Sequence, residues 1–329
     1  MDRVKWGILG AANIAYDQVV PAIRRSGMGD VIAVASKSKE KAKRFHVSNV
    51  YDSYEELLRD DQVDAVYIPL PNALHKEWAV KAMSAQKHVL VEKPATISED
   101  DMQEMCEAAQ QNHVIFMEAF MYQFHSQHQY VKELMGSGVI GDYRYVKAHF
   151  SFFLEDREDI RFNRELGGGA LWDVGCYGIH AVTQIVGMQP THISMIGKVD
   201  PEHQVDTTSV CFLQDDSNRC AEVSASFEGS FIDRYEIFGE KGAIIVESAF
   251  RPDVSKDGSG IVKLLDLNGH EIQRKSFEDD QYVKQVNHFQ ECVIHNKTPI
   301  YNESDSLKIV KYLESAYKSM RNASKEIEI

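Results

Sequence analysis

Cysteine is scarce in this chain of 329 residues, and no two cysteines have the Cys-x-x-Cys spacing of a zinc or redox motif. The five that occur are scattered, at Cys106, Cys176, Cys211, Cys220 and Cys292. Such an odd, scattered set argues against a disulfide framework and against structural zinc, and it is typical of a reducing compartment. The first residues also pass into a strand pattern without the apolar stretch of a secretion signal. We therefore expect a cytoplasmic protein.

Long apolar runs are also missing, since none approaches the ~20 residues that a membrane-spanning helix needs. Positive charge is in deficit, with 36 Lys and Arg against 50 Asp and Glu and a net charge of -14. A field of that sign repels a phosphate backbone. We therefore expect neither a membrane nor a nucleic acid as partner. The chain is longer than most chains that fold around a single hydrophobic core, so we expect two domains.

Residues 1–121 alternate short apolar strand patterns with helical patterns, as in a parallel sheet covered by helices. The expected strands lie at 4–9, 31–35, 65–70, 88–91 and 114–117. The expected helices lie near 14–26, 40–45, 54–60, 74–85 and 98–111. This order predicts an α/β dinucleotide-binding (Rossmann) domain with a doubly wound parallel sheet.

Residues 122–329 have a different pattern, in which strands follow one another across turns. Strands are expected at 143–153, 192–199, 207–213, 220–228, 235–238, 243–247, 262–267 and 271–277, and helices near 126–135, 282–295 and 304–321. The pattern predicts an α+β domain with a large, mostly antiparallel open sheet. Helices on one side would leave the other side open, and such a face usually marks an interface. We therefore expect a homodimer or homotetramer through the open sheet.

The first strand-to-helix turn has the position of a nucleotide-binding turn, where backbone amides and a helix N-terminus hold a diphosphate. Gly10, Ala12 and Ala15 stand at the fingerprint positions, with alanine where the second glycine usually permits the closest approach. A purely structural turn would look similar. The position favours a cofactor held by Gly10, Ala12, Asn13 and Ile14.

Ser36 and Lys37 follow the second strand, where an NAD-preferring enzyme usually offers an acidic residue to the ribose. No acidic residue stands there. Ser36 and Lys37, assisted by Lys41, could accept a 2′-phosphate, which predicts NADP as the cofactor, with NAD as the other candidate. The alternative is an ordinary solvated helix start rich in lysine.

Lys93 lies just after the expected strand 88–91, in the run Glu92, Lys93, Pro94. A lysine at the carboxyl end of a parallel strand lies at the edge where such sheets bind ligands. Desolvation and a nearby nicotinamide cation would lower its pKa towards the range of a general acid or base. Taken alone, the same lysine could be a solvated turn residue.

Three glycines at 167–169 precede a segment, 170–180, that holds several polar groups. If this segment is helical, Asp173, Tyr177 and His180 share one face. Gly175 and Gly178 weaken a helix by roughly 1 kcal/mol each, so a packed neighbour or a ligand should need a close approach there. Taken singly, such a tyrosine or histidine is usually structural.

A metal site is not expected. His125 and His128 share a helical face at a spacing that suits metal binding, but the sequence offers no evident third ligand. Cys176 is expected to be a packing residue, because no basic partner is placed to lower its thiol pKa.

Five segments resemble the glucose-fructose oxidoreductase, inositol dehydrogenase and rhizopine catabolism family, and the resemblance covers essentially the full length. They are the N-terminal turn, 69–75, 92–94, 117–122 and 167–180. Tyrosine rather than histidine at position 177 resembles the branch with dimeric dihydrodiol dehydrogenase, xylose dehydrogenase and glucose-fructose oxidoreductase. The resemblance implies a nicotinamide cofactor in the first domain and a sugar, polyol or diol substrate against the open sheet of residues 122–329, which would serve both substrate binding and oligomerisation.

The resemblance also implies roles for individual residues. Lys93 and Tyr177 would carry the proton while a hydride passes between substrate and nicotinamide. Asp173 would orient Lys93, and His180 would hold a substrate hydroxyl. The nicotinamide side of the cofactor site would be lined by Pro69, Asn72, His75, Glu92 and Lys93, with a cis peptide bond before Pro94.

Two departures from the family pattern weaken any transfer of specificity. Gln123 stands where many resembling sequences carry arginine, and Ser126 where they often carry proline. The sequence predicts an NADP-dependent dehydrogenase acting on CH–OH groups. Two alternatives remain, namely a cofactor-binding sensor or regulatory protein without turnover and an aldehyde or imine reductase.

Overall fold

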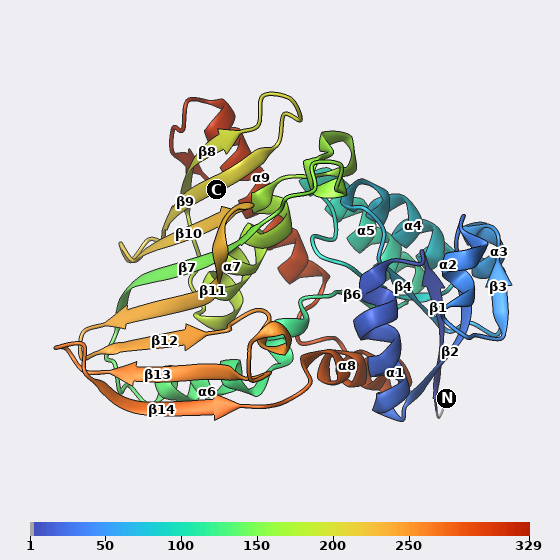
Figure 1. Cartoon of the computed structure of the whole chain (residues 1–329), viewed down its shortest axis with the longest axis horizontal. Helices are drawn as coiled ribbons and strands as arrows, with labels where there is room; N and C mark the ends of the chain where they lie inside the picture. The colour runs from blue at the N-terminus through green and yellow to red at the C-terminus, as the bar shows by residue number, and fades with distance from the viewer. Residues whose placement is uncertain (1–2) are drawn as a thin grey trace. The chain divides into compact units, whose positions relative to one another are not determined.

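The computed structural model describes residues 3–329 and divides the chain into two compact units (Figure 1). The first runs up to Met121 and also includes Gln281–Val310. The second consists of Tyr122–Asp280 and Lys311–Ile329. The segment Gln281–Val310 therefore groups with the first unit, although it follows most of the second along the chain. None of the helices within residues 3–329 combines the length and apolar character needed to cross a membrane.

The first unit contains a six-stranded parallel sheet in the order β3-β2-β1-β4-β5-β6. The five expected strands are confirmed to within two residues at most ends, and a short strand of half-buried residues, β3, was missed. The strands are β1 (Val4–Leu9), β2 (Gly29–Ala35), β3 (Asn49–Tyr51), β4 (Ala65–Ile68), β5 (His88–Val91) and β6 (Phe116–Glu118). Because β1 lies between β2 and β4, the strand order reverses there, which is where such sheets bind nucleotides.

Helices connect these strands and bury their apolar faces on the sheet. They are η1 (Ala15–Val19), α1 (Val20–Ser26), α2 (Lys39–Lys43), α3 (Tyr54–Leu58), α4 (Asn72–Ser84) and α5 (Glu99–Asn112), followed late in the chain by α8 (Gln281–His295) and the start of α9 (Glu303–Arg321). Helix α8 is fixed to the sheet at Trp6, which packs against Phe289 with ring centroids 5.0 Å apart. The Trp6 indole N–H also donates to the Gln290 side chain at 3.2 Å. These buried contacts explain why α8 groups with the first unit.

The second unit contains a nine-stranded sheet in the order β14-β13-β12-β11-β7-β10-β9-β8-β15. Only the β10–β7 pair is parallel within the described residues, so the expectation of a mostly antiparallel sheet is confirmed. The strands are β7 (Tyr143–Phe153), β8 (His192–Val199), β9 (Asp206–Gln214), β10 (Cys220–Ser226), β11 (Glu228–Gly239), β12 (Ala243–Glu247), β13 (Gly260–Leu265), β14 (Glu271–Phe277) and β15 (Ile327–Glu328).

One strand assignment was wrong. The expected strand at 220–228 ends at Ser226, and β11 begins at Glu228 and takes in the strand expected at 235–238. The register of β11 on β7 shifts between Glu228 and Ile232. This irregularity breaks the alternation of buried and exposed side chains, which is the signal that the sequence offers for a strand.

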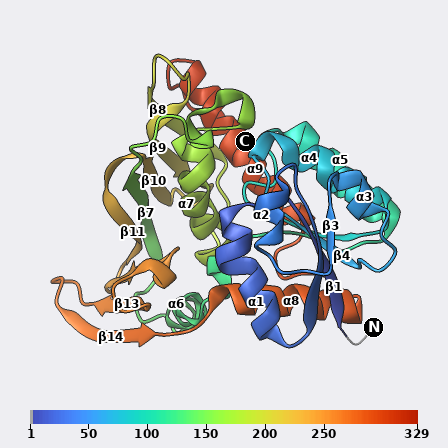
Figure 2. The same ribbon diagram turned by 45° about the vertical axis from the view of Figure 1, so that its right-hand side comes forward.

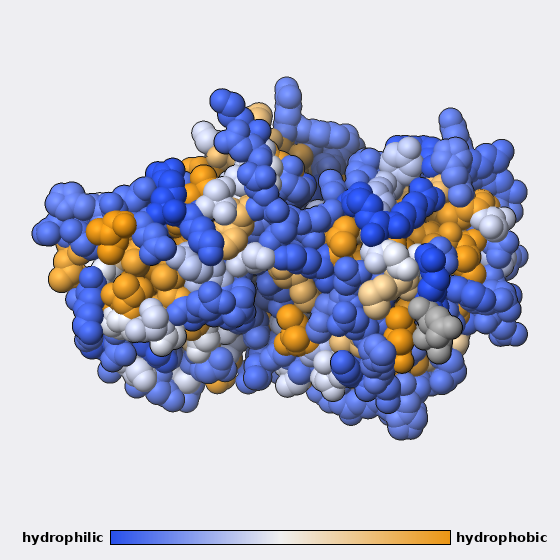
Figure 3. All heavy atoms as spheres, turned by 90° about the horizontal axis from the view of Figure 1, so that it is seen from below, coloured by the Kyte–Doolittle hydropathy of each residue, from blue (hydrophilic) through white to orange (hydrophobic). Residues whose placement is uncertain are grey.

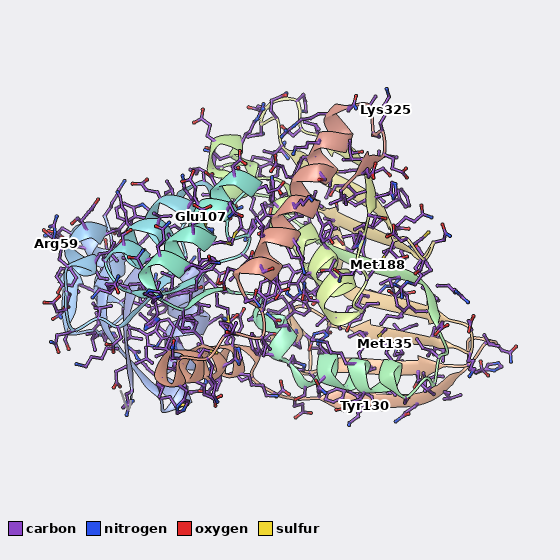
Figure 4. The ribbon with its side chains drawn as sticks, turned by 180° about the vertical axis from the view of Figure 1, so that it is seen from behind. Arg59, Glu107, Tyr130, Met135, Met188 and Lys325 are labelled. Atoms are coloured by element: carbon purple, nitrogen blue, oxygen red, sulfur yellow. The ribbon has the colours of Figure 1, made fainter. Side chains whose placement is uncertain are left out.

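The helices of the second unit lie on one side of its sheet, as Figure 2 shows for α6 and α7. They are η2 (Met121–Phe124), α6 (Ser126–Gly136), η3 (Ile160–Phe162), η4 (Arg164–Leu166), η5 (Leu171–Gly175), α7 (Cys176–His180), η6 (Ala181–Ile185), η7 (Pro252–Val254) and the end of α9. Tyr130, labelled in Figure 4, shows how α6 is attached, because its hydroxyl accepts a hydrogen bond from Gln273 of β14 at 2.7 Å.

The opposite side of this sheet carries a mixture of apolar and charged side chains. Ile196 and Phe212 are 61% and 48% exposed, and Lys147 lies 3.7 Å from Glu222 on the same side. Figure 3 shows another face of the molecule, on which most atoms belong to hydrophilic residues and hydrophobic ones occur in small groups.

Candidate active site

The nucleotide-type turn follows β1 and depends on Gly10. Its φ is +114°, and an added Cβ would lie 2.8 Å from Leu70 Cδ2, so only glycine fits without strain. The Gly10 N–H donates to the Ala35 carbonyl at 2.9 Å, which ties the turn to β2. Helical residues begin at Asn13. The amides of Ala12, Asn13 and Ile14 thus stand at a helix N-terminus, where an anionic diphosphate is stabilised.

The residues expected to hold a 2′-phosphate follow β2. Ser36 is 7% exposed, and its hydroxyl accepts the Ser38 N–H at 3.1 Å. Ser38 in turn caps α2 by accepting the Lys41 N–H at 3.3 Å. The side chains of Lys37 and Lys41 are exposed. Two ammonium groups therefore flank a compact turn at the carboxyl end of β2.

Lys93 is partly exposed and lies in a short loop after β5, with the expected cis peptide bond between it and Pro94. Glu92, just before it, accepts a hydrogen bond from the Tyr67 hydroxyl of β4 at 2.5 Å. Because β4 and β5 are parallel neighbours, this loop and the residues after β4 meet at one edge of the sheet. Pro69 is buried there, and Asn72 is half-buried at the start of α4.

His75 lies within α4 and braces this loop. Its ring is fully buried, with Nδ1 2.9 Å from the Pro94 carbonyl oxygen and Nε2 2.6 Å from the Leu70 carbonyl oxygen. Burial lowers the pKa of His75 to about 4, so the ring is neutral at physiological pH. A role for His75 beside the nicotinamide stays a prediction, and the structure adds a bracing role that the sequence did not indicate.

In the second unit, the segment that follows the three glycines is helical and forms η5 and α7. An added Cβ at Gly178 would lie 2.4 Å from Val223 of β10 and 3.3 Å from Ala148 of β7. At Gly175 it would lie 3.3 Å from Ala225 Cβ. The close approach inferred from these glycines is therefore that of a packed sheet, which brings the helix backbone onto β7 and β10.

Asp173 is held by an arginine that sequence reasoning missed. Arg161 donates from Nε to Asp173 Oδ2 at 2.7 Å and also contacts Asp159. The Asp173 carboxylate is the main reason that the pKa of Arg161 is raised above its ordinary value. The charge-assisted hydrogen bond from Arg161 fixes the orientation of the Asp173 carboxylate. No periodic pattern marks Arg161, because it lies in η3, a helix of only three residues between β7 and η5.

Tyr177 is 5% exposed, and its ring is enclosed by other aromatic rings. The ring centroids of Tyr122, Phe150 and Phe250 lie 5.6, 5.6 and 5.4 Å away. These contacts fix the plane of the phenol ring. The direction of the Tyr177 hydroxyl is therefore set by ring packing as well as by the helix.

His180 is fully buried, and its Nδ1 lies 2.7 Å from the Tyr122 hydroxyl. Burial lowers the pKa of His180 well below its ordinary value, so the ring is neutral. Tyr122 thus contacts both His180 and Tyr177. Contact of His180 with a substrate hydroxyl stays a prediction.

The histidines at metal-like spacing have other partners. The ring nitrogens of His128 lie 2.8 Å from the Tyr235 hydroxyl and 2.9 Å from the Ala249 carbonyl oxygen. His125 Nε2 lies 3.3 Å from Asp279. Within residues 3–329, no three His, Cys, Asp or Glu side chains are grouped so as to hold a metal ion. Cys176 is fully buried, and its thiol contacts the Asp173 carbonyl at 3.5 Å.

The predicted site residues therefore belong to both units. Lys93 and the proposed cofactor residues belong to the first, whereas Asp173, Tyr177 and His180 belong to the second. Convergence of Lys93 and Tyr177 on one substrate atom stays a prediction.

A parallel dinucleotide-type sheet followed by a large open sheet is the architecture of a class of nicotinamide-dependent oxidoreductases, and the comparisons agree. A family model described as "Oxidoreductase family, NAD-binding Rossmann fold" matches residues 4–120, and the GFO/IDH/MocA C-terminal domain matches residues 128–245. The chain belongs to the GFO/IDH/MocA family of oxidoreductases.

Relatives of defined activity match over nearly the whole length. A dTDP-3,4-didehydro-2,6-dideoxy-alpha-D-glucose 3-reductase of Actinomadura kijaniata is 29% identical, over 97% of this chain and 96% of its own. The NADP-dependent D-xylose 1-dehydrogenase 2 of Haloferax volcanii is 32% identical, over 95% of this chain and 96% of its own. A trans-1,2-dihydrobenzene-1,2-diol dehydrogenase of Xenopus tropicalis is 28% identical, over 96% of this chain and 98% of its own.

Solved structures have the same fold. The 3-ketoreductase of Actinomadura kijaniata, in complex with NADP and TDP-benzene, superposes with a TM-score of 0.90 at 29% identity, covering 96% of this chain and 97% of that one. An aldose-aldose oxidoreductase of Caulobacter crescentus has a TM-score of 0.89 at 23% identity, with coverage of 99% and 100%, and this likeness concerns the fold alone.

Proposed function

We propose that the protein is an NADP-dependent oxidoreductase that acts on the carbinol or carbonyl carbon of a sugar, polyol or diol. The observation that carries the proposal is the position of Lys93, which is partly exposed at the carboxyl edge of the parallel sheet. Its neighbours Glu92 and Pro94 are held there by Tyr67 and His75. The activities of the reductase and dehydrogenase relatives support this substrate class.

The donor groups present suit a dinucleotide. The helix N-terminus after Gly10 would hold its diphosphate, Lys37 and Lys41 with Ser36 would hold the 2′-phosphate, and the other end would rest near Pro69, Asn72 and Glu92. When bound, NADP supplies the hydride acceptor, or in the reduced form the donor.

The residues of the protein move the proton. In the oxidative direction, the substrate C–H bond gives up a hydride and the hydroxyl proton passes to the Lys93 amine, to the Tyr177 phenolate or to the two acting together, leaving a carbonyl. Asp173, held in place by Arg161, would orient the amine of Lys93. His180 would hold a neighbouring substrate hydroxyl. In the reductive direction the same groups return the proton.

A substrate panel tests this function. Aldoses, inositols, trans-diols and a dTDP-linked keto sugar are assayed with NADP or NADPH at the absorbance band of the reduced nicotinamide. We expect turnover with at least one of these classes. Tight NADP binding without turnover across the panel would instead identify a cofactor-binding sensor.

Cofactor preference is expected to depend on Lys37 and Lys41. Replacing both by alanine removes two charged contacts to the 2′-phosphate, so KM for NADP should rise by about ten- to a hundredfold while KM for NAD stays nearly constant. Lys43→Ala, which changes an exposed lysine of the same helix, is the control. A wild-type enzyme that prefers NAD would contradict the assignment.

The open side of the nine-stranded sheet is proposed to join two copies into a homodimer, or two dimers into a tetramer. Ile196 and Phe212 provide exposed apolar surface there, beside the Lys147–Glu222 ion pair. Light scattering should show a mass of at least twice the monomer, and Phe212→Glu should shift it towards the monomer because a carboxylate would be buried unpaired. Leu267→Glu, which changes an exposed residue in the β13–β14 turn, should leave the mass unchanged. A monomeric wild-type protein would rule out the proposal.

A further inference from the structure

The loop that carries Lys93 is held by buried side chains from three separate elements. Tyr67 of β4 donates to the Glu92 carboxylate, and His75 of α4 contacts the Pro94 carbonyl. The third contact comes from Glu118, the last residue of β6, whose Oε1 accepts the Ala95 N–H at 2.8 Å. The backbone on both sides of Lys93 is thus fixed within the first unit.

Glu118 is unusual among these three because it is a carboxylate with no exposed surface. Its second oxygen accepts a hydrogen bond from the Tyr301 hydroxyl at 3.0 Å. Tyr301 is itself fully buried, and its ring packs edge-on against Phe120 with centroids 5.7 Å apart. It lies between α8 and α9, so a residue 183 positions away in sequence anchors the carboxylate beside the Lys93 loop.

Two opposing effects act on the pKa of the Glu118 carboxyl group. Burial raises its pKa to about 7, while Ser306, the Ala95 N–H, Tyr301 and the Lys93 ammonium all favour the ionised form. Lys93 also acts on His75, where its positive charge favours the neutral ring. The groups of the first unit that act on this region are therefore Lys93, His75, Glu92, Tyr301 and Ser306, with Asp305 acting on Tyr301.

A buried carboxylate is costly to a fold, because an apolar side chain could fill the same volume without desolvating a charge. A purely structural bond to the Ala95 N–H would need only a neutral acceptor such as the amide oxygen of glutamine. Glu118 instead places a titratable charge within electrostatic reach of the amine that is proposed to move the proton.

We propose that Glu118 and Tyr301 form a positioning pair for Lys93. Glu118 fixes the backbone that follows Lys93 and supplies negative charge to its amine, and Tyr301 fixes the carboxylate of Glu118. The inference rests on the proposed role of Lys93 in proton transfer. It also makes the late segment Gln281–Val310 part of the catalytic apparatus rather than only a helical cover for the sheet.

The informative variant is Glu118→Gln, which preserves the shape of the side chain but removes its charge. The amide oxygen can still accept the Ala95 N–H, and the amide NH2 can donate to the Tyr301 hydroxyl, which reverses that hydrogen bond. The Lys93 ammonium then loses a stabilising negative charge, so its pKa should fall by about one unit. Alcohol oxidation needs the neutral amine, so the rising limb of kcat against pH should move to lower pH by the same amount. KM for NADP should change by less than about twofold, because Glu118 is not proposed to contact the cofactor.

Tyr301→Phe keeps the aromatic packing and removes only the hydroxyl that stabilises the carboxylate. More of Glu118 is then protonated near neutral pH. The rising limb of kcat against pH should therefore also move to lower pH, but by less than in Glu118→Gln. In the Glu118→Gln background, Tyr301→Phe should cause no further shift, because the two residues act as a unit. Tyr51→Phe is the matched control, since it removes a hydroxyl that donates to Asp60 at 2.9 Å in the same unit.

A second measurement does not depend on turnover. Competitive acetylation of Lys93, followed against pH by peptide mass spectrometry, reports the pKa of its amine, with Lys76 as the internal reference. We expect a lower pKa for Lys93 in Glu118→Gln and no change for Lys76. A folded Glu118→Gln protein with an unchanged Lys93 pKa and pH profile would overturn the positioning pair, as would a loss of thermal stability alone.

The two proposals fail in different ways. If Lys93→Ala keeps its turnover, the proposed function is wrong. If Lys93→Ala loses turnover while Glu118→Gln leaves the Lys93 pKa unchanged, only the positioning pair is wrong.

Discussion

Replacing Lys93 by alanine should lower kcat by about a hundred- to ten-thousandfold, which is the usual contribution of a positioned general acid or base. The loop around Lys93 should keep its conformation, because Tyr67, His75 and Glu118 contact the neighbours of Lys93 in the chain and not the lysine side chain. NADP affinity should therefore stay within a few-fold of the wild-type value.

The measurement is kcat on the best substrate of the panel, together with a fluorescence titration of NADP. Lys76→Ala is the control, because Lys76 is a lysine of α4 whose ammonium pairs with Glu104 at 2.6 Å. An unchanged kcat for Lys93→Ala would defeat the mechanism, whatever the cofactor affinity.

Tyr177→Phe should lower kcat by about a hundredfold, since a phenylalanine lacks the hydroxyl that takes or gives the proton. The fold should tolerate the substitution. The ring contacts with Tyr122, Phe150 and Phe250 do not involve the hydroxyl, so thermal stability should stay close to that of the wild type.

The matched control is Tyr130→Phe on α6, which removes a hydroxyl bonded to Gln273 of β14 and should leave kcat unchanged. Steady-state rates and melting curves of both variants separate catalysis from folding. A Tyr177→Phe enzyme with wild-type kcat would leave Lys93 as the only candidate for proton transfer.

The sequence predicted the elements whose side chains repeat regularly. Strands β1, β5, β7, β8, β12 and β14 begin and end at the expected residues, because their apolar and polar positions are bounded by clear turn residues. It missed β3, which has only three residues, and it divided β11 wrongly because of a register shift. Short or irregular strands offer too few positions for a periodic pattern.

The sequence indicated those parts of the candidate site that are marked by local motifs. The nucleotide turn, the Lys93 loop and the helical segment with Asp173 and Tyr177 were all recognisable. The residues that hold these motifs in place could not be recognised from the sequence. Arg161 contacts Asp173 from the three-residue helix η3, and Tyr301 contacts Glu118 from a distant part of the sequence.

The sequence also did not predict which of the candidate side chains are buried. His75 and His180 were expected to face ligands, but both rings are fully buried and bonded to protein groups. Whether a side chain is buried depends on the packing of distant elements, and no single-chain pattern reports that for an isolated histidine. The fold of each unit therefore assigns these two residues supporting contacts in addition to any role at the substrate.

The central claim is that Lys93 and Tyr177 meet at one substrate oxygen. A crystal structure of the protein with NADP and a bound substrate or product tests it most directly. The account predicts the Lys93 Nζ and the Tyr177 hydroxyl both within about 3 Å of the carbinol or carbonyl oxygen. A complex in which either group lies out of hydrogen-bonding reach of that oxygen, with no bridging water, would contradict the account.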